Sequence, residues 1–155
     1  MNSENFRIGI VVSRFNEEIS NRLLDGASTH LQNSSDFIAD ISVRWVPGAF
    51  EIPFACQEVI DKTHVDAIIA LGSVVKGGTP HFDFVAGECI RGIQAVSLST
   101  KTPISLGVLT TNTYEQALER SDSSYVDHDG SSGDKGASAA EAAITMIRLV
   151  RSLTD

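Results

Sequence analysis

Residues 65–90, VDAIIALGSVVKGGTPHFDFVAGECI, carry the signal of a strand, a turn and a helix in direct succession. The run from Val65 to Leu71 is almost wholly apolar and has the length of a buried strand. Gly77 and Gly78 then mark a turn, and Pro80 favours the first turn of a helix. This succession is the repeating unit of parallel α/β folds.

The same unit recurs along the chain. Three further apolar runs have strand length, and a helical pattern follows each of them: Ile8–Val12, Ile41–Val46 and Ile104–Leu109. Near-continuous apolar strands that alternate with helices predict a parallel sheet covered on both faces. We therefore expect an α/β fold, a doubly wound three-layer αβα sandwich with a mainly four-stranded sheet, formed by residues 1–155 as a single domain. Such folds bind ligands at the carboxyl ends of their strands.

The amino-acid composition argues against several classes of binding partner and location. The chain of 155 residues has 20 acidic and 12 basic residues and a net charge of −8, which disfavours nucleic acids and anionic membranes as partners. Its N-terminus shows no export signal, and no run approaches the length of a transmembrane helix. Cys56 and Cys89 lie in apolar helical patterns without CxxC spacing, which favours buried reduced thiols over a disulfide or a metal site. We expect a cytoplasmic protein without a metal.

The glycine turn combines an anion site with a proton carrier. Gly77 and Gly78 leave the backbone open to a ligand, and amides from Thr79 onward point out of the helix start toward an anion. Lys76 adds a positive charge, and His81 carries an imidazole that titrates near neutrality. The phosphate-loop and dinucleotide fingerprints are absent. The turn therefore predicts phosphate binding and proton transfer without identifying the substrate.

The chain resembles the lumazine synthase family in five segments, namely VVSRFNEEIS at 11–20, VPGAFEIPFA at 46–55, the glycine turn at 72–88, LGVLTTNTYEQALERS at 106–121 and GDKGASAAEAAITM at 133–146. They follow the family's order and spacing over nearly the whole chain. The resemblance implies a flavodoxin-like fold. It also implies the penultimate step of riboflavin biosynthesis, in which 5-amino-6-(D-ribitylamino)uracil and 3,4-dihydroxy-2-butanone 4-phosphate form 6,7-dimethyl-8-ribityllumazine, phosphate and water. Such a transferase needs proton transfers but no cofactor.

The resemblance gives individual residues a role. His81 becomes the proton-transfer residue, and Phe15 becomes the aromatic ring that stacks on the pyrimidine. Further substrate-binding positions are Ala49, Phe50, Glu51, Ser73, Val74, Val75 and Leu106. The phosphate-binding positions are Gly78, Thr79, Arg120 and Lys135, and the forked donors of an arginine suit a phosphate well.

Structural roles are open for several of these residues. His81 can instead pack at the helix start, Phe15 can pack in the core, and Glu51 can cap a helix. Arg120 can be a solvated side chain that offsets a helix dipole. The remaining histidines have no comparable flanking motif, and we expect them to be structural: His30, His64 and His128.

Three positions depart from the common family pattern. Leu106 replaces an aromatic or other large apolar residue, Lys76 stands where arginine is frequent, and Asp134 replaces an asparagine. A carboxylate at position 134 would oppose phosphate binding unless Lys135 neutralises it. A lumazine- or flavin-binding paralogue with weak or no catalysis therefore remains an alternative. A receiver-type domain does not fit, because the strand ends read SRFN, PGAF and GSVVKGG and lack an acidic cluster.

The polar segment SDSSYVDHDGSSGD, residues 121–134, predicts a surface loop. Its DHDG core does not fit a calcium loop, because Tyr125 and Gly136 stand where acidic ligands are needed.

Family resemblance further implies a pentameric ring with sites between subunits. One chain would supply Phe15, residues 49–51, residues 73–79 and His81, and the next would supply Leu106, Arg120 and Lys135. The loop is longer than in relatives that build icosahedral shells, so we expect a homopentamer or a decamer. Docking of a riboflavin synthase is a further prediction from the family.

Overall fold

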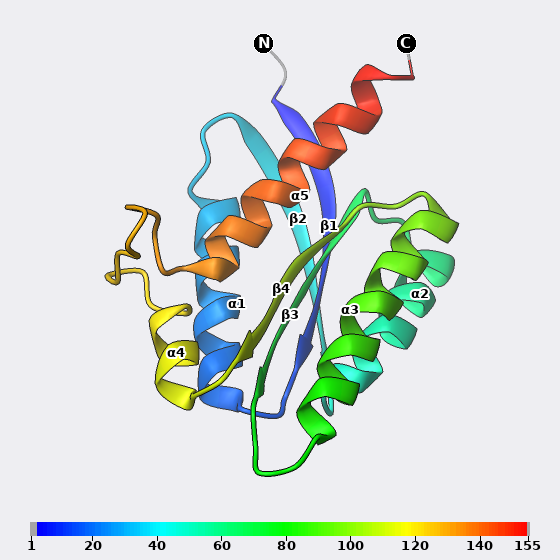
Figure 1. Cartoon of the computed structure of the whole chain (residues 1–155). Helices are drawn as coiled ribbons and strands as arrows, with labels where there is room; N and C mark the ends of the chain where they lie inside the picture. The colour runs from blue at the N-terminus through cyan, green and yellow to red at the C-terminus, as the bar shows by residue number, and fades with distance from the viewer. Residues whose placement is uncertain (1–2, 155) are drawn as a thin grey trace.

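The computed structural model describes residues 3–154 and contains a four-stranded sheet in the order β2-β1-β3-β4 (Figure 1). All neighbouring strands are parallel. The strands are β1 (Glu4–Ser13), β2 (Phe37–Val46), β3 (Ala67–Val75) and β4 (Ile104–Thr111). The predicted α/β fold with a parallel sheet is therefore confirmed.

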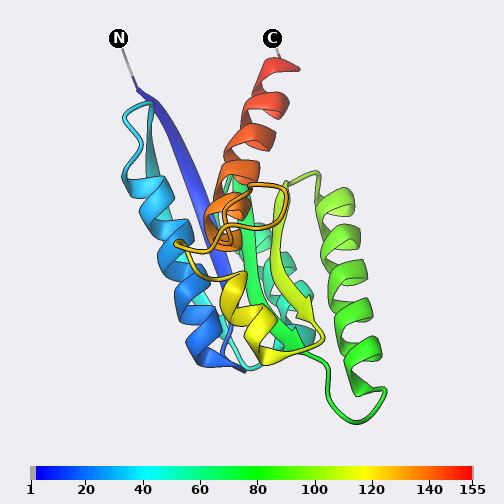
Figure 2. The ribbon, with the colours of Figure 1, turned by 60° about the vertical axis from the view of Figure 1, so that its left-hand side comes forward.

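Helices cover both faces of the sheet (Figures 1 and 2). One face carries α1 (Glu17–Gln32), α4 (Tyr114–Glu119) and α5 (Lys135–Ser152). The other carries α2 (Ile52–Lys62) and α3 (His81–Thr100), with the 3₁₀ turn η1 (Ala49–Glu51) before α2. Each face has its own hydrophobic core, as expected for a three-layer sandwich.

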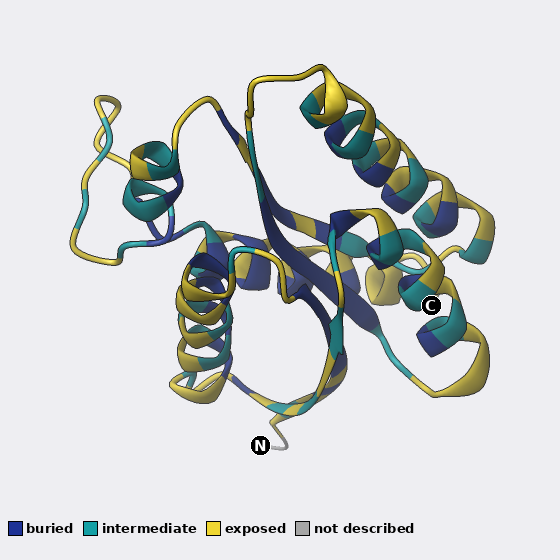
Figure 3. Cartoon of the chain, turned by 90° about the horizontal axis from the view of Figure 1, so that it is seen from below, coloured by how far each residue is buried: buried dark blue, intermediate teal, exposed yellow. Residues whose placement is uncertain are grey.

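Side chains of β1 point to both faces of the sheet and contribute to both hydrophobic cores. Phe6, Ile8 and Ile10 pack on the side of α1 and α5, whereas Val11 packs on the side of α2 and α3. Figure 3 looks at the carboxyl ends of the strands and shows the buried sheet between helices whose outer faces are exposed. None of the helices in the described part of the chain is long and apolar enough to cross a membrane.

The edge strand β2 is longer than its apolar run predicts. It begins at Phe37 rather than at Ile41, and its first residues pair in register with β1, with Glu4 opposite Phe37. The exposed Asp40 interrupts the apolar run within the strand. Because one face of an edge strand can remain in solvent, an apolar run underestimates its length.

A topological switch point lies between β1 and β3. The chain leaves β1 for α1 on one face and leaves β3 for α3 on the other. Pairing between β1 and β3 ends at Val12 and Leu71, whereas β3 continues beside β4 as far as Val75. The diverging chain opens a crevice at the carboxyl end of the sheet, where doubly wound folds bind their ligands.

Candidate active site

A cleft of about 810 Å³ opens at this end of the sheet. The ends of β1 and β3, the loop after β2 and the first turns of α3 form it. Most of the predicted residues of the first subunit line it, namely Phe15, Phe50, Glu51, Ser73, Val74, Val75, Thr79 and His81. The fold thus brings together residues from three separate sequence segments. Ala49 and Gly78 lie in the same loops but are not among the lining residues.

Phe15 presents its ring to the cleft. It is 72% exposed, so it is not a core residue of this chain. Its backbone N–H donates to the carbonyl of Pro47 at 3.1 Å, and the N–H of Arg14 donates to the carbonyl of Val46 at 2.8 Å. These two bonds extend the β1–β2 ladder and hold the main chain of Phe15 at the cleft.

The loop after β2 contributes a carboxylate and a second aromatic ring. Glu51 precedes α2 but makes no side-chain capping bond there. Its side chain lines the cleft, which favours a ligand role over a capping role. Phe50 is 64% exposed, whereas Ala49 is buried and can offer a ligand only its backbone.

The glycine turn is open around its two central residues. A Cβ placed on Gly77 or Gly78 would meet no atom within 4 Å, and neither residue has a positive φ. Local backbone conformation therefore does not require glycine at either position. A side chain added at either position would project into open space.

His81 is the first residue of α3, and Pro80 occupies the N-cap position rather than the first turn. The backbone N–H of His81 lies 3.4 Å from Oγ1 of Thr79. The imidazole is exposed and makes no hydrogen bond or ion pair with the described residues. The imidazole is therefore accessible from the cleft that it lines.

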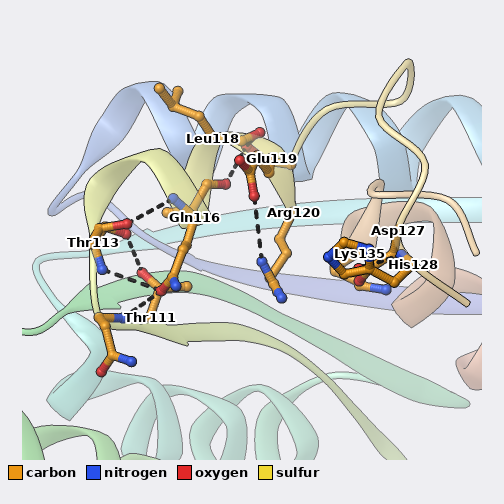
Figure 4. A network of polar contacts seen from close by, with 12 residues as sticks. Thr111, Thr113, Gln116, Leu118, Glu119, Arg120, Asp127, His128 and Lys135 are labelled. Atoms are coloured by element: carbon orange, nitrogen blue, oxygen red, sulfur yellow. Dashed lines mark hydrogen bonds and ion pairs between the residues drawn. The ribbon is translucent and has the colours of Figure 1, made fainter.

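Arg120 and Lys135 form a second group outside this cleft. Arg120 is the C-cap of α4, a helix that begins with a capping box of Thr113 and Gln116. The backbone N–H of Lys135 donates to the carbonyl of Arg120 at 3.0 Å, so the two residues lie together (Figure 4). The Arg120 guanidinium reaches a carboxylate oxygen of Glu119 only at 3.9 Å, which is a weak surface contact.

Leu106, the third residue predicted for the next subunit, lies on the edge strand β4. It is 50% exposed and does not line the cleft of its own chain. We count Leu106 in the second group with Arg120 and Lys135, because all three lie outside the cleft of their own chain.

Comparison with known families identifies the family of the chain. A family model described as 6,7-dimethyl-8-ribityllumazine synthase matches residues 5–151. The chain belongs to this family. Lumazine synthases are transferases, and the match covers the cleft, the glycine turn and the second group of residues together.

In this lumazine synthase family member, Asp134 has a different place from the one expected. It is only 9% exposed, and its side-chain Oδ1 accepts the N–H of Ala137 at 3.0 Å, which makes it the N-cap of α5. The carboxylate also lies against Gly26 of α1. The carboxylate therefore has a structural role as the cap that stabilises the start of α5.

Residues 121–134 form an exposed or half-buried loop for most of their length, as predicted. Two of its carboxylates are satisfied within the loop, because Asp122 accepts from Ser124 and Asp129 accepts from Ser131. These bonds lower the pKa of both aspartates. Within residues 3–154, no group of three or more possible metal ligands is present.

Sequence reasoning missed part of the cleft wall. Phe82 and Val85 belong to an apolar stripe of α3, in which apolar residues recur every three or four positions, as is typical of core residues. They are nevertheless only half-buried, and they line the cleft together with Phe84 and Glu88. Phe84 is 70% exposed. It falls outside the apolar stripe of α3, and an aromatic residue on the polar face of a helix was the signal that could have identified it.

Proposed function

We propose that this chain is a catalytically active lumazine synthase. It would condense 5-amino-6-(D-ribitylamino)uracil with 3,4-dihydroxy-2-butanone 4-phosphate and release 6,7-dimethyl-8-ribityllumazine, phosphate and water. The observation that carries the proposal is the cleft itself, where an exposed aromatic ring, a strand end, a free carboxylate and a free imidazole meet: Phe15, Ser73–Val75, Glu51 and His81.

The cleft suits a flat heterocycle with a polar chain. The ring of Phe15 offers an apolar face for stacking on the pyrimidine. Main-chain groups of Ser73, Val74 and Val75 lie at the end of β3, where they can bond to the edge of that ring. Glu51 supplies an acceptor for ribityl hydroxyls.

Proton transfer is assigned to His81. Imine formation, phosphate elimination and ring closure all move protons between nitrogen, carbon and oxygen. The imidazole lies at the cleft wall beside the glycine turn, where Thr79 and nearby amides would receive the phosphate. Holding two reactants together contributes more to such a condensation than one acid–base group, so His81 assists a reaction that proximity largely drives.

The second group of residues supports sites shared between subunits. Arg120, Lys135 and Leu106 do not line the cleft of their own chain, although all three match family positions. We infer that they complete the cleft of a neighbouring copy in a homopentamer or a decamer of single-domain cytoplasmic subunits. Exposed apolar side chains near the cleft, including those of Phe50 and Phe84, would be covered by such a neighbour.

The experiment mixes two variants that are each expected to have impaired activity. His81→Ala and Arg120→Ala subunits are purified separately, unfolded, combined in equal amounts and refolded, and lumazine formation is followed by fluorescence. If each site takes His81 from one subunit and Arg120 from the next, random mixing restores about a quarter of the sites. If both residues belong to one subunit's site, no site is restored. An unmixed wild-type protein without activity would refute the proposed reaction itself.

A lumazine- or flavin-binding paralogue is the second candidate. Leu106 favours it, because a smaller apolar residue leaves one side of the substrate ring less covered. The carboxylate of Asp134 caps α5, which gives it a structural role besides any effect on phosphate binding. Tight binding of lumazine by a wild-type protein that makes no product would select this candidate.

A further inference from the structure

Phe15 must be held in place by its backbone. Its ring is 72% exposed, so packing within the chain does not fix it. The hydrogen bonds from Arg14 and Phe15 to the loop after β2 fix the chain as it arrives from β1. The direction in which the chain then leaves toward α1 depends on the next residue, Asn16.

Asn16 has a left-handed backbone, with φ 61° and ψ 52°. Among the described residues, only Asn16 and Lys101 combine a positive φ with a side chain. This conformation is unfavourable for most L-residues, and asparagine tolerates it better than others. It turns the chain sharply between Phe15 and the first turn of α1, so the backbone of Asn16 links the position of Phe15 to that of the helix.

The side chain of Asn16 makes a second connection. Its Nδ2 donates to the carbonyl of Ser73 at 3.0 Å. The ladder between β1 and β3 has its last pair at Val12 and Leu71, so the Ser73 carbonyl lies beyond the reach of β1. The amide of Asn16 replaces the strand donor that is no longer available there.

We propose that Asn16 is a positioning residue that fixes Phe15 relative to the end of β3. This inference rests on the proposed function, in which a pyrimidine ring stacks on Phe15 and bonds along its edge to Ser73–Val75. Asn16 connects the two parts of the protein that would contact the pyrimidine. Its backbone follows directly after Phe15, and its side-chain amide bonds to Ser73 at the end of β3. A small change in the separation between Phe15 and the end of β3 would weaken both the stacking and the hydrogen bonds to the ring edge.

Two substitutions test the contribution of the amide while the left-handed backbone can be kept. Asn16→Gly allows the left-handed backbone but removes the amide, and Asn16→Asp replaces the donor by a carboxylate facing a carbonyl. For Asn16→Gly we expect the KM for the pyrimidine and the Kd for lumazine to rise about fivefold to tenfold, as after loss of one hydrogen bond. The KM for the butanone phosphate should stay unchanged, and Asn16→Asp should have the larger effect.

Lys101→Gly is the matched control. Lys101 is the other left-handed residue, and it ends α3 at the opposite end of that helix from His81. This variant should leave both KM values and kcat unchanged. If Asn16→Gly has unchanged constants, or changes the two KM values equally, the positioning role is refuted while the synthase function stands.

Hydrogen exchange adds a readout that does not require catalysis. The N–H of Phe15 is bonded to Pro47, and it should exchange faster in Asn16→Gly than in the wild-type protein without ligand. Unchanged protection would refute the inference. A wild-type protein that neither binds lumazine nor forms it would instead refute the proposed function, and the pyrimidine role of Asn16 with it.

Discussion

Asp134 and Gly26 pack against each other where α5 begins beside α1. A Cβ placed on Gly26 would contact both carboxylate oxygens of Asp134, and it would lie 2.6 Å from Oδ2. Oδ1 also accepts the N–H of Ala137 at 3.0 Å, so the carboxylate is held between the two helices. The packing of α1 against α5 therefore depends on both Gly26 and Asp134.

Loss of the cap should destabilise the fold without changing the substrate site. Asp134→Ala removes the acceptor for Ala137 and should lower the free energy of unfolding by about 1 kcal/mol. Asp134→Asn keeps a good N-cap and should stay within about 0.5 kcal/mol of the wild type. Urea denaturation measures both. A large change in the KM for the butanone phosphate in Asp134→Asn would show that the carboxylate does act at the phosphate site.

Two glycines at the same helix contact should differ in their tolerance. A Cβ on Gly26 meets a side chain that can move, whereas a Cβ on Gly136 would lie 2.8 Å from the carbonyl carbon of Leu23, which is fixed in α1. Gly136→Ala should therefore cost about 1–3 kcal/mol of unfolding free energy, and Gly26→Ala should cost less. Equal costs, measured by the same denaturation, would show that the helices can separate.

His81→Ala should lower kcat by about a hundredfold, the low end of the range for general acid–base catalysis. Its KM values should change little, because the imidazole has no partner that organises the cleft. His64→Ala, at an exposed position outside the cleft, is the control and should behave as the wild type. Steady-state kinetics of lumazine formation decide this. A His81→Ala variant with full activity would assign proton transfer to another group.

Arg120→Lys tests whether the phosphate is recognised by the paired N–H donors of the guanidinium group. Lysine keeps the charge but loses the paired geometry, so the KM for the butanone phosphate should rise about tenfold. Inhibition by inorganic phosphate should weaken in parallel, and the KM for the pyrimidine should not change. Parallel increases in both KM values would point instead to a disturbed subunit contact.

Burial of the two thiols predicts a loss of stability at alkaline pH. Burial raises the pKa of Cys56 from 9.0 to about 12, with a smaller contribution from Cys89, and burial raises the pKa of Cys89 to about 11. In this range the unfolded chain loses thiol protons that the folded chain keeps. Stability should therefore be full below pH 9 and fall between about pH 9 and 12.

The double variant Cys56→Ala, Cys89→Ala should show a shallower decline over the same range. Urea denaturation at several pH values measures it. An equal slope in the two proteins would mean that other groups cause the alkaline loss.

Strand positions could be predicted from sequence, but their ends could not. The apolar runs identified all four strands, because buried parallel strands lack polar residues. β1 begins at Glu4 rather than Ile8, since its first residues pair with the edge strand. β3 runs on to Val75 because β4 supplies partners beyond Gly72, where β1 has already turned away. Such lengths depend on neighbouring strands, which no local pattern contains.

Prediction of the site was strongest where a motif fixes the backbone. The glycine turn and the PGAFE segment bring Glu51, Thr79 and His81 into one cleft, as the family resemblance implies. Asn16 and Phe84 were missed for different reasons. The left-handed backbone of Asn16 and its bond to Ser73 exist only once β1 and β3 are adjacent. Phe84 did not fit the stripe that the helical pattern selects.

The unstrained backbone at Gly77 and Gly78 has a consequence for how these positions evolve. Folding alone places no demand on them, since a methyl group there would meet no atom of the chain and no positive φ must be kept. A library of variants sorted by protein abundance should therefore accept alanine at both sites. The same library sorted by growth of cells that depend on this chain for riboflavin should retain glycine. The difference between the two selections would show, for each residue, whether glycine is kept because function requires it or because folding requires it.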